Sequence, residues 1–414
     1  MNQNRWIVLG GCFLAYLFDA VEIILLSLAL PSIRNDLGLS AAQGGLLVTA
    51  TLIGIGVSSV AGGYVADNYG RKKALLAALI TFGIFTAAIS VVPNFAWFLV
   101  LRFLAGVGLG SVWSVVSAYI VETWSVESRG RAAAFVISAF PAGGAAAAMI
   151  SGYFLPDWRM MFLVSGVAVV VPVLIIGTLF RESAKWTEQK SQHAAETVIV
   201  RDVFEPSLRR TTILGTMMAA FALTGYWGAM TWLPTYLAVE RGLPSSSVAY
   251  FVTILNVGMF IGYNGFGLLA DHIGRHRTIV ITLLGVATIM PIYAITNDHE
   301  TLLWLGPLFG LFTAFFGLFG SYLAELFPTR VRSTGAGFCF NVGRGVSAIA
   351  PFALAGISGA IGFSGGLIVC SGFFALAAVI ALLLPSVGKH AAGAEMDPEA
   401  SGQPASQLRS HPIK

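Results

Sequence analysis

Four charged residues lie inside long apolar stretches of the chain, where a charge is costly unless it has a partner or a task. They are Asp19, Glu22, Arg102 and Arg344. At the centre of a bilayer such a charge costs about 2.5–3.5 kcal/mol on insertion scales. A buried carboxylic acid can take up and release a proton, because burial favours the neutral acid and a nearby arginine favours the carboxylate. A guanidinium can hold a carboxylate through two hydrogen bonds.

The stretches around these charges are typical of helices that cross a membrane. Hydrophobic residues make up 56% of the 414 residues and charged residues 11%, against about 45–50% and 25% in soluble domains. With a mean hydropathy of +0.80, this composition excludes a soluble globular protein. The apolar runs are about 20 residues long, the length that a helix needs to span a bilayer. We therefore predict an all-α membrane protein.

Twelve apolar runs divide into two sets of six around a polar stretch near the middle of the chain. The runs are 6–31, 43–66, 74–92, 95–121, 133–155, 160–180, 211–238, 248–270, 278–297, 302–326, 334–356 and 363–385. We predict twelve transmembrane helices in two pseudo-symmetric six-helix bundles. The expected units are an N-terminal bundle at 1–180, a cytoplasmic linker at 181–210, a C-terminal bundle at 211–385 and a disordered cytoplasmic tail at 386–414.

Basic residues indicate the orientation of these helices. They gather in alternate loops, at Arg71 to Lys73, Arg129 to Arg131, Arg275 to Arg277 and Arg330 to Arg332. Cytoplasmic loops carry the excess of Lys and Arg, so we expect both termini in the cytoplasm and the protein in an inner (plasma) membrane. The net charge of +4 then reflects attraction to anionic lipid in the bilayer and not a nucleic-acid partner.

Asp19 and Glu22 are three residues apart and therefore lie on one face of the first helix. At a rise of about 1.5 Å per residue, Asp19 lies about 20 Å from the cytoplasmic side and Arg102 about 10 Å from the outer side. In a core about 30 Å thick these depths coincide, so we expect Asp19 and Arg102 to pair. If the pair opens and closes, it links proton binding to conformation, with Glu22 sharing the proton or contacting substrate. The alternative is a static ion pair.

Arg344 lies about 15 Å into the eleventh run, and no acid lies within the membrane part of helices seven to twelve. A guanidinium at this depth without a partner in its own half is a candidate site for a carboxylate. The alternative is a cation that backbone carbonyls satisfy.

The two halves of the chain repeat each other. Five residues recur 204 positions later and three recur 203 positions later: Gly63, Ala66, Asp67, Gly70 and Arg71 as Gly267, Ala270, Asp271, Gly274 and Arg275, and Tyr119, Glu122 and Arg129 as Tyr322, Glu325 and Arg332. Parallel repeats of this kind are typical of transporters whose site lies between the halves.

These motifs carry a resemblance that covers nearly the whole chain. The segment Gly63 to Lys73 resembles the loop signature of the major facilitator superfamily, and Arg102 to Gly110 resembles its helix-four signature. Ala324 to Arg332 resembles the branch that contains sugar porters, organic-ion transporters and aromatic-acid:proton symporters. The resemblance implies alternating access by rocking of the two halves.

The same resemblance bears on the buried charges. Proton-coupled sugar and acid symporters carry an acid and an arginine at the places of Asp19 and Arg102, which implies a coupling pair. Organic-anion and aromatic-acid transporters have an arginine at the place of Arg344, which implies a site for the carboxylate of the substrate.

The repeated loop charges are expected to latch one conformation without touching substrate. We expect Asp67 and Asp271 to pair with helix ends and nearby arginines. Glu122 is expected to pair with Arg129 and Arg131, and Glu325 with Arg330 and Arg332. The predicted gate residues are Asp67, Arg71, Glu122, Arg129, Asp271, Arg275, Glu325 and Arg332.

Aromatic side chains in helices four, seven and ten lie in helices that line the cavity of the superfamily. The candidates are Trp113, Tyr226, Trp227, Trp232, Phe309, Phe312 and Phe316. Each is also well suited to ordinary packing, and as a group they can enclose a planar apolar body. We assign substrate binding to Arg344, Asn341, Trp113, Tyr226, Trp227 and Phe312.

We predict a monomeric proton-coupled symporter that imports an organic monocarboxylate with an aromatic body. A sugar or other neutral-solute symporter would need amide side chains in helix seven, and 221–236 contains no Gln or Asn. A non-transporting sensor would have lost the gate residues, and Ala139 to Gly144 only partly resembles the drug-antiporter signature. The sequence has no metal-ligand cluster, catalytic triad or phosphate-binding loop, so we expect no enzyme activity, metal or cofactor.

Overall fold

The computed structural model describes residues 4–125, 129–183, 187, 200–328 and 331–386, and within them the chain is helical without a strand. The helices are α1 (Arg5–Leu37), α2 (Ala41–Tyr69), α3 (Arg71–Ile89), α4 (Phe95–Thr123), α5 (Arg129–Ile137), α6 (Ala139–Phe154), α7 (Trp158–Ala168), α8 (Val170–Leu179), the 3-10 helix η1 (Val200–Phe204), α10 (Arg209–Val239), α11 (Ser245–Ile273), α12 (Arg275–Ile295), α13 (His299–Phe312), α14 (Phe315–Glu325), α15 (Arg332–Ser347) and α16 (Ala350–Leu383).

These helices make twelve crossings, as predicted. Short breaks divide some crossings in two, so that α5 continues as α6, α7 as α8 and α13 as α14. The long apolar span Thr334–Leu383 holds the last two crossings, which meet at Gly362. Gly362 has φ 76°, a conformation that favours glycine. The carboxylate of Glu240 accepts hydrogen bonds from the backbone N–H groups of Phe363 and Ser364 just after this turn.

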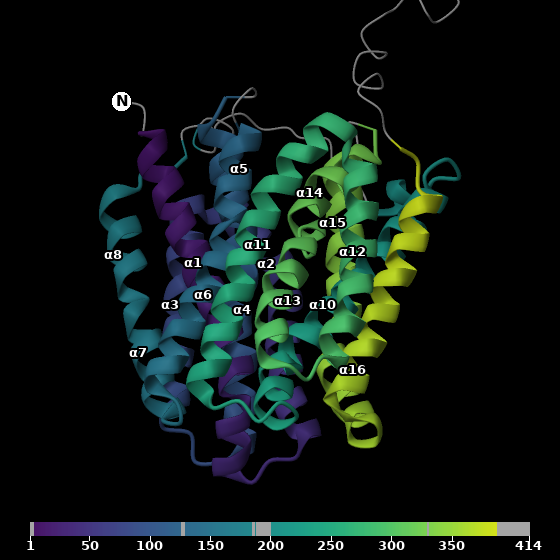
Figure 1. Cartoon of the computed structure of the whole chain (residues 1–414). Helices are drawn as coiled ribbons and strands as arrows, with labels where there is room; N and C mark the ends of the chain where they lie inside the picture. Colours follow the sequence, from purple (N-terminus) through teal and green to yellow (C-terminus); the bar gives the residue numbers. More distant parts are fainter. Residues whose placement is uncertain (1–3, 126–128, 184–186, 188–199, 329–330, 387–414) are drawn as a thin grey trace, which may run out of the picture.

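The crossings lie side by side, roughly parallel to one another (Figure 1). We call the end where α1 begins and α16 ends the terminal face, and the other end the opposite face. In the first half α4 packs on α2 and α3, and α1 packs on α6. In the second half α10 packs on α15 and α16, and α11 on α13. The halves meet where α6 contacts α11, α2 contacts α16, and α1 contacts α10.

The predicted unit boundaries at 180 and 211 stay a prediction. Most of the predicted linker and nearly all of the predicted tail lie outside the described residues.

Polar side chains cap the helices at their starts. Ser40 and Gln43 form a reciprocal capping box at the start of α2, which satisfies two backbone donors that the helix itself leaves unpaired. Asp298 accepts hydrogen bonds from the backbone N–H and the hydroxyl of Thr301 at the start of α13. These bonds favour the carboxylate and lower the pKa of Asp298.

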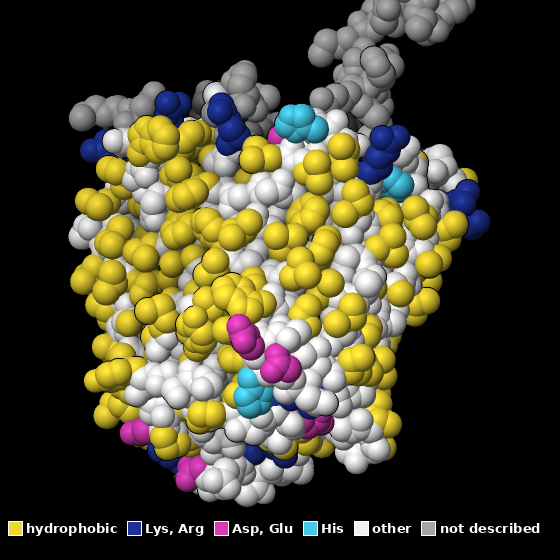
Figure 2. All heavy atoms as spheres, in the orientation of Figure 1, with side chains coloured by type: hydrophobic (Ala, Val, Ile, Leu, Met, Phe, Trp, Pro, Cys, Tyr) yellow, Lys and Arg dark blue, Asp and Glu magenta, His cyan; other side chains and the backbone are white. Residues whose placement is uncertain are grey.

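The type of side chain on the surface changes along the helix axes. Figure 2 shows hydrophobic side chains over the middle of the visible face, with several Lys and Arg side chains at the terminal face. Large apolar side chains such as Leu174 and Leu382 are exposed, each at 59%. Exposed apolar side chains in mid-helix are expected where a helix faces lipid.

Candidate functional site

Arg102 lies fully buried in α4 and is paired with Glu22 of α1. One guanidinium nitrogen, Nη1, lies 2.5 Å from Oε1 of Glu22, and Nε donates to the Thr51 hydroxyl of α2 at 3.0 Å. The pair and its hydrogen bond therefore join α1, α2 and α4. Removing one partner of such a buried pair costs about 3–5 kcal/mol, because the other charge is left uncompensated.

The predicted pair between Asp19 and Arg102 is therefore wrong. Residues three apart in a helix differ by about 4.5 Å along the axis and about 60° around it. The depth estimate does not resolve one helical turn, and it carries no information on rotation about the axis. Glu22 lies nearer the opposite face than Asp19, and its longer side chain reaches Arg102.

Asp19 instead faces Arg344 across the boundary between the halves. Its carboxylate, on α1, interacts electrostatically with the guanidinium of Arg344 on α15, and Tyr16 lies near both groups. Asp19 and Arg344 are 5% and 9% exposed. Oδ1 of Asp19 and Nε of Arg344 have no hydrogen-bond partner. The acid that Arg344 lacks in its own half thus comes from the other half, and both groups keep unused hydrogen-bonding capacity.

A chain of aromatic rings from both halves leads to this pair of charges. The Arg344 guanidinium lies 5.3 Å from the centre of the Phe340 ring. From there, ring contacts at centroid distances of 4.9 to 6.1 Å connect seven residues that we call the aromatic cluster: Phe340, Phe316, Phe140, Tyr16, Trp113, Tyr226 and Trp227. Phe140 and Phe316 stack across the boundary between the halves at 5.7 Å.

Three of the predicted aromatic site residues, Trp113, Tyr226 and Trp227, belong to this cluster, whereas Phe312 does not. The Phe312 ring packs against the Phe266 ring within the second half, with 5.7 Å between ring centroids. It also lies directly against Gly285. The assignment of Phe312 to the substrate site stays a prediction. Phe312 is the last residue of α13, and Phe316 lies in the next helix, α14. Asn341 is half-buried and makes no side-chain hydrogen bond to a described residue.

Sequence reasoning missed three members of the cluster, Tyr16, Phe140 and Phe340. Tyr16 precedes Asp19 by three residues and Phe340 precedes Arg344 by four, so each lies one helical turn from a buried charge. That spacing was the available signal. Phe140 carries no comparable signal, because its position depends on how α6 packs against the second half.

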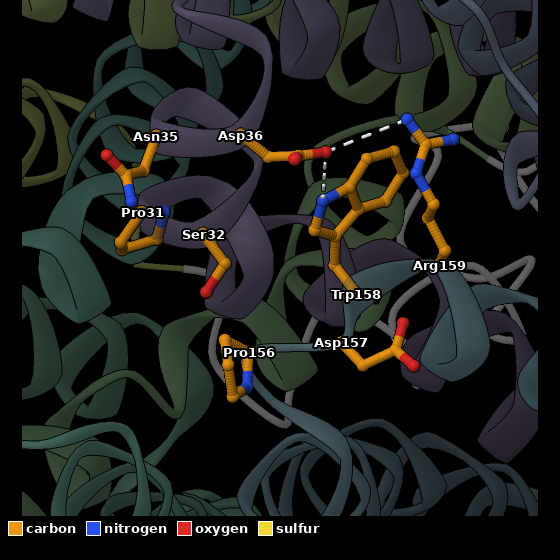
Figure 3. Close-up of a pocket in the computed structure, with 8 residues that line it drawn as sticks. All are labelled: Pro31, Ser32, Asn35, Asp36, Pro156, Asp157, Trp158 and Arg159. Atoms are coloured by element: carbon orange, nitrogen blue, oxygen red, sulfur yellow. Dashed lines mark hydrogen bonds and ion pairs between the residues drawn. The ribbon is translucent and has the colours of Figure 1, made fainter.

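A narrow cavity lies beside the cluster between the two halves. It is lined by Ile23, Ser27 and Phe140 of the first half and by Tyr226, Trp227, Thr231 and Asn256 of the second, among others. A larger hollow of about 680 Å³ opens at the opposite face, between the end of α1 and the start of α7 (Figure 3). There Asp36 accepts a hydrogen bond from Trp158 Nε1 at 3.2 Å and lies 3.6 Å from Nη2 of Arg159.

Among the described residues, no group of three or more His, Cys, Asp or Glu side chains is placed to hold a metal ion. Cys12, Cys339 and Cys370 are buried free thiols.

Comparison with known protein families gives a match over most of the chain. Residues 12–320 match the family described as Major Facilitator Superfamily. The chain belongs to the major facilitator superfamily. It is accordingly a multi-pass membrane transporter and not an enzyme. The predicted fold of twelve helices is confirmed for this facilitator.

The resemblance to the organic-acid branch is also confirmed. The facilitator is 29% identical to a cis,cis-muconate transport protein of Acinetobacter baylyi, over 92% of this chain and 95% of that protein. It is 28% identical to a 3-(3-hydroxy-phenyl)propionate transporter of Escherichia coli, over 83% and 84%. Its fold is like that of a D-xylose-proton symporter, with a TM-score of 0.76 at 17% identity, covering 92% of this chain and 98% of that one.

The charges at the terminal face of the facilitator form pairs that correspond in the two halves. Arg71 at the start of α3 lies 2.9 Å from Glu122 near the end of α4. Arg275 at the start of α12 is paired in the same way with Glu325 at the end of α14. The repeat therefore extends to the contacts themselves.

These pairs give each glutamate a partner that was not predicted. Glu122 and Glu325 each pair with the arginine that begins the third helix of their half, whereas the predicted pairing with the loop arginines stays a prediction. Arg131 and Asp271 are exposed. The side chains of Asp67, Arg129 and Arg332, and all of Arg330, lie outside the described residues. Glu182, which sequence reasoning missed, accepts hydrogen bonds from the backbone N–H groups of Arg71 and Lys72.

At the opposite face the halves of the facilitator are in close contact. A Cβ placed on Gly45 of α2 would lie 2.7 Å from the carbonyl oxygen of Pro351 in α16. The same carbonyl accepts a hydrogen bond from Nε1 of Trp232 at 2.8 Å. The Arg34 guanidinium of α1 lies 6.0 Å from the Trp232 ring, so Trp232 contributes to closure of this face and not to the aromatic cluster.

Proposed function

We propose that this facilitator is a proton-coupled symporter that imports an organic monocarboxylate with an aromatic body, acting as a monomer. One observation carries the proposal: Asp19 of the first half faces Arg344 of the second, and each is buried with an unused hydrogen-bonding atom. The two groups lie on elements that must separate when the halves rock. Their interaction therefore depends on both conformation and protonation.

Charge balance supports the coupling of proton and acid. When Asp19 is ionised it neutralises Arg344, and a substrate carboxylate must compete with it. When Asp19 is protonated, Arg344 is left with an uncompensated charge that a substrate carboxylate can neutralise through two hydrogen bonds. Both states are neutral overall, which a low-dielectric centre favours. One proton and one carboxylate thus enter together.

The aromatic cluster and the name of one relative support an aromatic substrate body. The cluster joins rings from both halves and reaches Arg344 through Phe340, which suits a planar apolar body. One similar protein is named for a hydroxyphenyl propionate, which is an aromatic monocarboxylate. Another is named for muconate, an acyclic dicarboxylate, so that name supports only an organic acid. We assign the Glu22–Arg102 pair to support of the site, because Arg102 is fully buried and hydrogen-bonded within its own half.

Transport into liposomes tests the proposal. With the purified protein in liposomes and an inward proton gradient, benzoate or a hydroxybenzoate should accumulate faster than in protein-free liposomes, above its external concentration, and should carry protons inward in a one-to-one ratio. The matching amide and sugars such as xylose should not accumulate. Accumulation of the amide or of a sugar to the same level would contradict the monocarboxylate proposal, and acid uptake that ignores the proton gradient would contradict symport.

We further propose that the terminal face is cytoplasmic and that the structure is closed toward the outside. The proposal on orientation is supported by the Lys and Arg side chains at the terminal face (Figure 2), because cytoplasmic loops are enriched in these residues. The proposal on closure is supported by the contacts of Gly45 with Pro351 and of Arg34 with Trp232. The charge pairs at the terminal face would then act as cytoplasmic gates.

Gly45→Val should open the outer side, because its side chain collides with the backbone at Pro351. The matched control is Gly56→Val in the same helix, where an added Cβ meets nothing within 4 Å. On a cysteine-free background, Ser27→Cys in the cavity should react several-fold faster with impermeant maleimide added to intact cells when Gly45→Val is present. Asp298→Cys should react in every background. If Asp298→Cys is labelled only in permeabilised cells, the proposed orientation is wrong. If Gly45→Val does not change the labelling rate of Ser27→Cys, the proposal that Gly45 helps to close the outer side is wrong.

A further inference from the structure

Three residues that line the cavity beside the aromatic cluster each carry a buried polar atom without a hydrogen-bond partner. These atoms are Nε1 of Trp227, Oγ1 of Thr231 and Oδ1 of Asn256. The side chains are 4%, 1% and 4% exposed, so bulk water does not reach them freely. A buried polar group left without a partner costs about 1–3 kcal/mol. A ligand bound in the cavity would explain why the residues that line it carry three such groups.

The positions of the three groups follow from their helices. Trp227 and Thr231 are four residues apart in α10 and lie on one face of it. Asn256 comes from α11, where its Nδ2 donates to the Val252 carbonyl at 2.8 Å. This bond uses the donor end of the amide, so the unused atom that Asn256 presents is an acceptor.

The chemistry of the three groups selects the ligand. The indole N–H of Trp227 can only donate, Oδ1 of Asn256 can only accept, and the Thr231 hydroxyl can do either. A hydroxyl group satisfies this set, since it accepts from Trp227 and donates to Asn256. A second carboxylate does not, because it meets an acceptor oxygen, and none of the described residues that line the cavity is charged.

The cavity lies within reach of a ligand held by Arg344. Phe140 and Tyr226 line the cavity and also belong to the aromatic cluster that extends to Phe340 beneath Arg344. Along α1, the cavity residue Ile23 is four positions from Asp19, which is about 6 Å of helix rise. An aromatic ring lying in the cluster therefore has one end toward Arg344 and the other toward the cavity.

The geometry points to a hydroxyl-binding subsite formed by Trp227, Thr231 and Asn256, which selects acids that carry a neutral hydroxyl at the end away from the carboxylate. This inference rests on the proposed function, because it assumes a carboxylate at Arg344. It adds a preference that the aromatic cluster alone does not supply: a hydroxylated monocarboxylate over both its unsubstituted parent and the corresponding dicarboxylate.

Binding to the purified protein, measured by calorimetry, tests the subsite. The ligands are benzoate, 3- and 4-hydroxybenzoate, the methoxy analogues, isophthalate, terephthalate and the amides of the hydroxy acids. The better hydroxybenzoate should bind about tenfold more tightly than benzoate, as expected for one or two net hydrogen bonds. Its methoxy analogue, which cannot donate, should lose most of that advantage, and the dicarboxylates should bind more weakly than benzoate.

Variants assign the preference to residues. Asn256→Leu and Thr231→Val should reduce the advantage of the hydroxyl to about twofold or less, because they weaken binding of the hydroxybenzoate much more than binding of benzoate. The matched control is Thr235→Val, which removes another unpartnered buried hydroxyl of α10 that does not line the cavity. It should keep the full advantage. The same result is expected for both variants, and they lie on different helices. If one of them misfolds, the other still tests the subsite.

The outcomes separate the subsite from the proposed function. If benzoate binds and its amide does not, but hydroxylation gives no advantage in the parent protein, the subsite is wrong and the carboxylate site stands. The subsite is also wrong if a dicarboxylate binds best, or if Thr235→Val has the same effect as Thr231→Val. If the amides bind as well as the acids, or no acid binds, the proposed function itself fails and the subsite with it.

Discussion

Asp19→Asn should abolish uphill accumulation of the acid while leaving its binding intact or stronger. The amide resembles the protonated form of Asp19, which leaves Arg344 free for a substrate carboxylate, but it cannot release a proton. In the parent protein, acid binding should weaken as the pH rises, by about tenfold per pH unit where Asp19 is ionised, because ionised Asp19 competes for Arg344. In Asp19→Asn the affinity should be nearly independent of pH. Liposome uptake and calorimetry between about pH 5 and 9 measure both effects.

Glu22→Gln provides the comparison that separates the two acids of α1. It leaves the fully buried Arg102 without its counter-ion, which should lower the free energy of unfolding by about 3–5 kcal/mol. The thermal midpoint of Glu22→Gln should therefore fall further than that of Asp19→Asn, because Glu22 is hydrogen-bonded to Arg102, whereas Oδ1 of Asp19 and Nε of Arg344 have no hydrogen-bond partner. The assignment of the proton to Asp19 is overturned if Asp19→Asn accumulates the acid as the parent does and Glu22→Gln alone loses coupling without losing stability.

Arg344→Lys should bind the acid about one to two orders of magnitude more weakly than the parent, although the charge is kept. The guanidinium holds a carboxylate as a planar fork, whereas a lysine offers a single point charge in a different place. Loss of one charge-assisted hydrogen bond costs about 1.5–3 kcal/mol, which corresponds to this change in affinity. Calorimetry with the best acid measures it.

Comparison of the acid with its amide shows whether Arg344 touches the carboxylate. The amide should bind the parent more weakly than the acid by a similar factor, and Arg344→Ala should bind the two about equally. A thermal scan without ligand provides the control for folding. If Arg344→Ala still prefers the acid as strongly as the parent does, the carboxylate is held elsewhere and Arg344 has a structural role.

Local properties of the chain were sufficient to predict the crossings and the buried charges. Hydrocarbon cannot hydrogen-bond to a backbone, so every crossing must be a helix about 20 apolar residues long, and its length is readable from the sequence. A buried charge is costly in the membrane, so a charged residue inside an apolar run indicates a partner or a function. Four residues were predicted to be important on this ground: Asp19, Glu22, Arg102 and Arg344. The repeat of Gly63 to Arg71 at Gly267 to Arg275 carried the family resemblance.

Only the tertiary structure decided which of these groups meet. Glu22, and not Asp19, contacts Arg102, because the contact depends on rotation of α1 about its axis and on side-chain length. Asp19 interacts electrostatically with Arg344 only through the way the halves dock, and the cavity with Thr231 and Asn256 likewise forms only between helices. Hydropathy varies along the chain and reports depth in the membrane, whereas pairing depends on tilt, rotation and packing between helices far apart in sequence. Those quantities are set by the whole bundle.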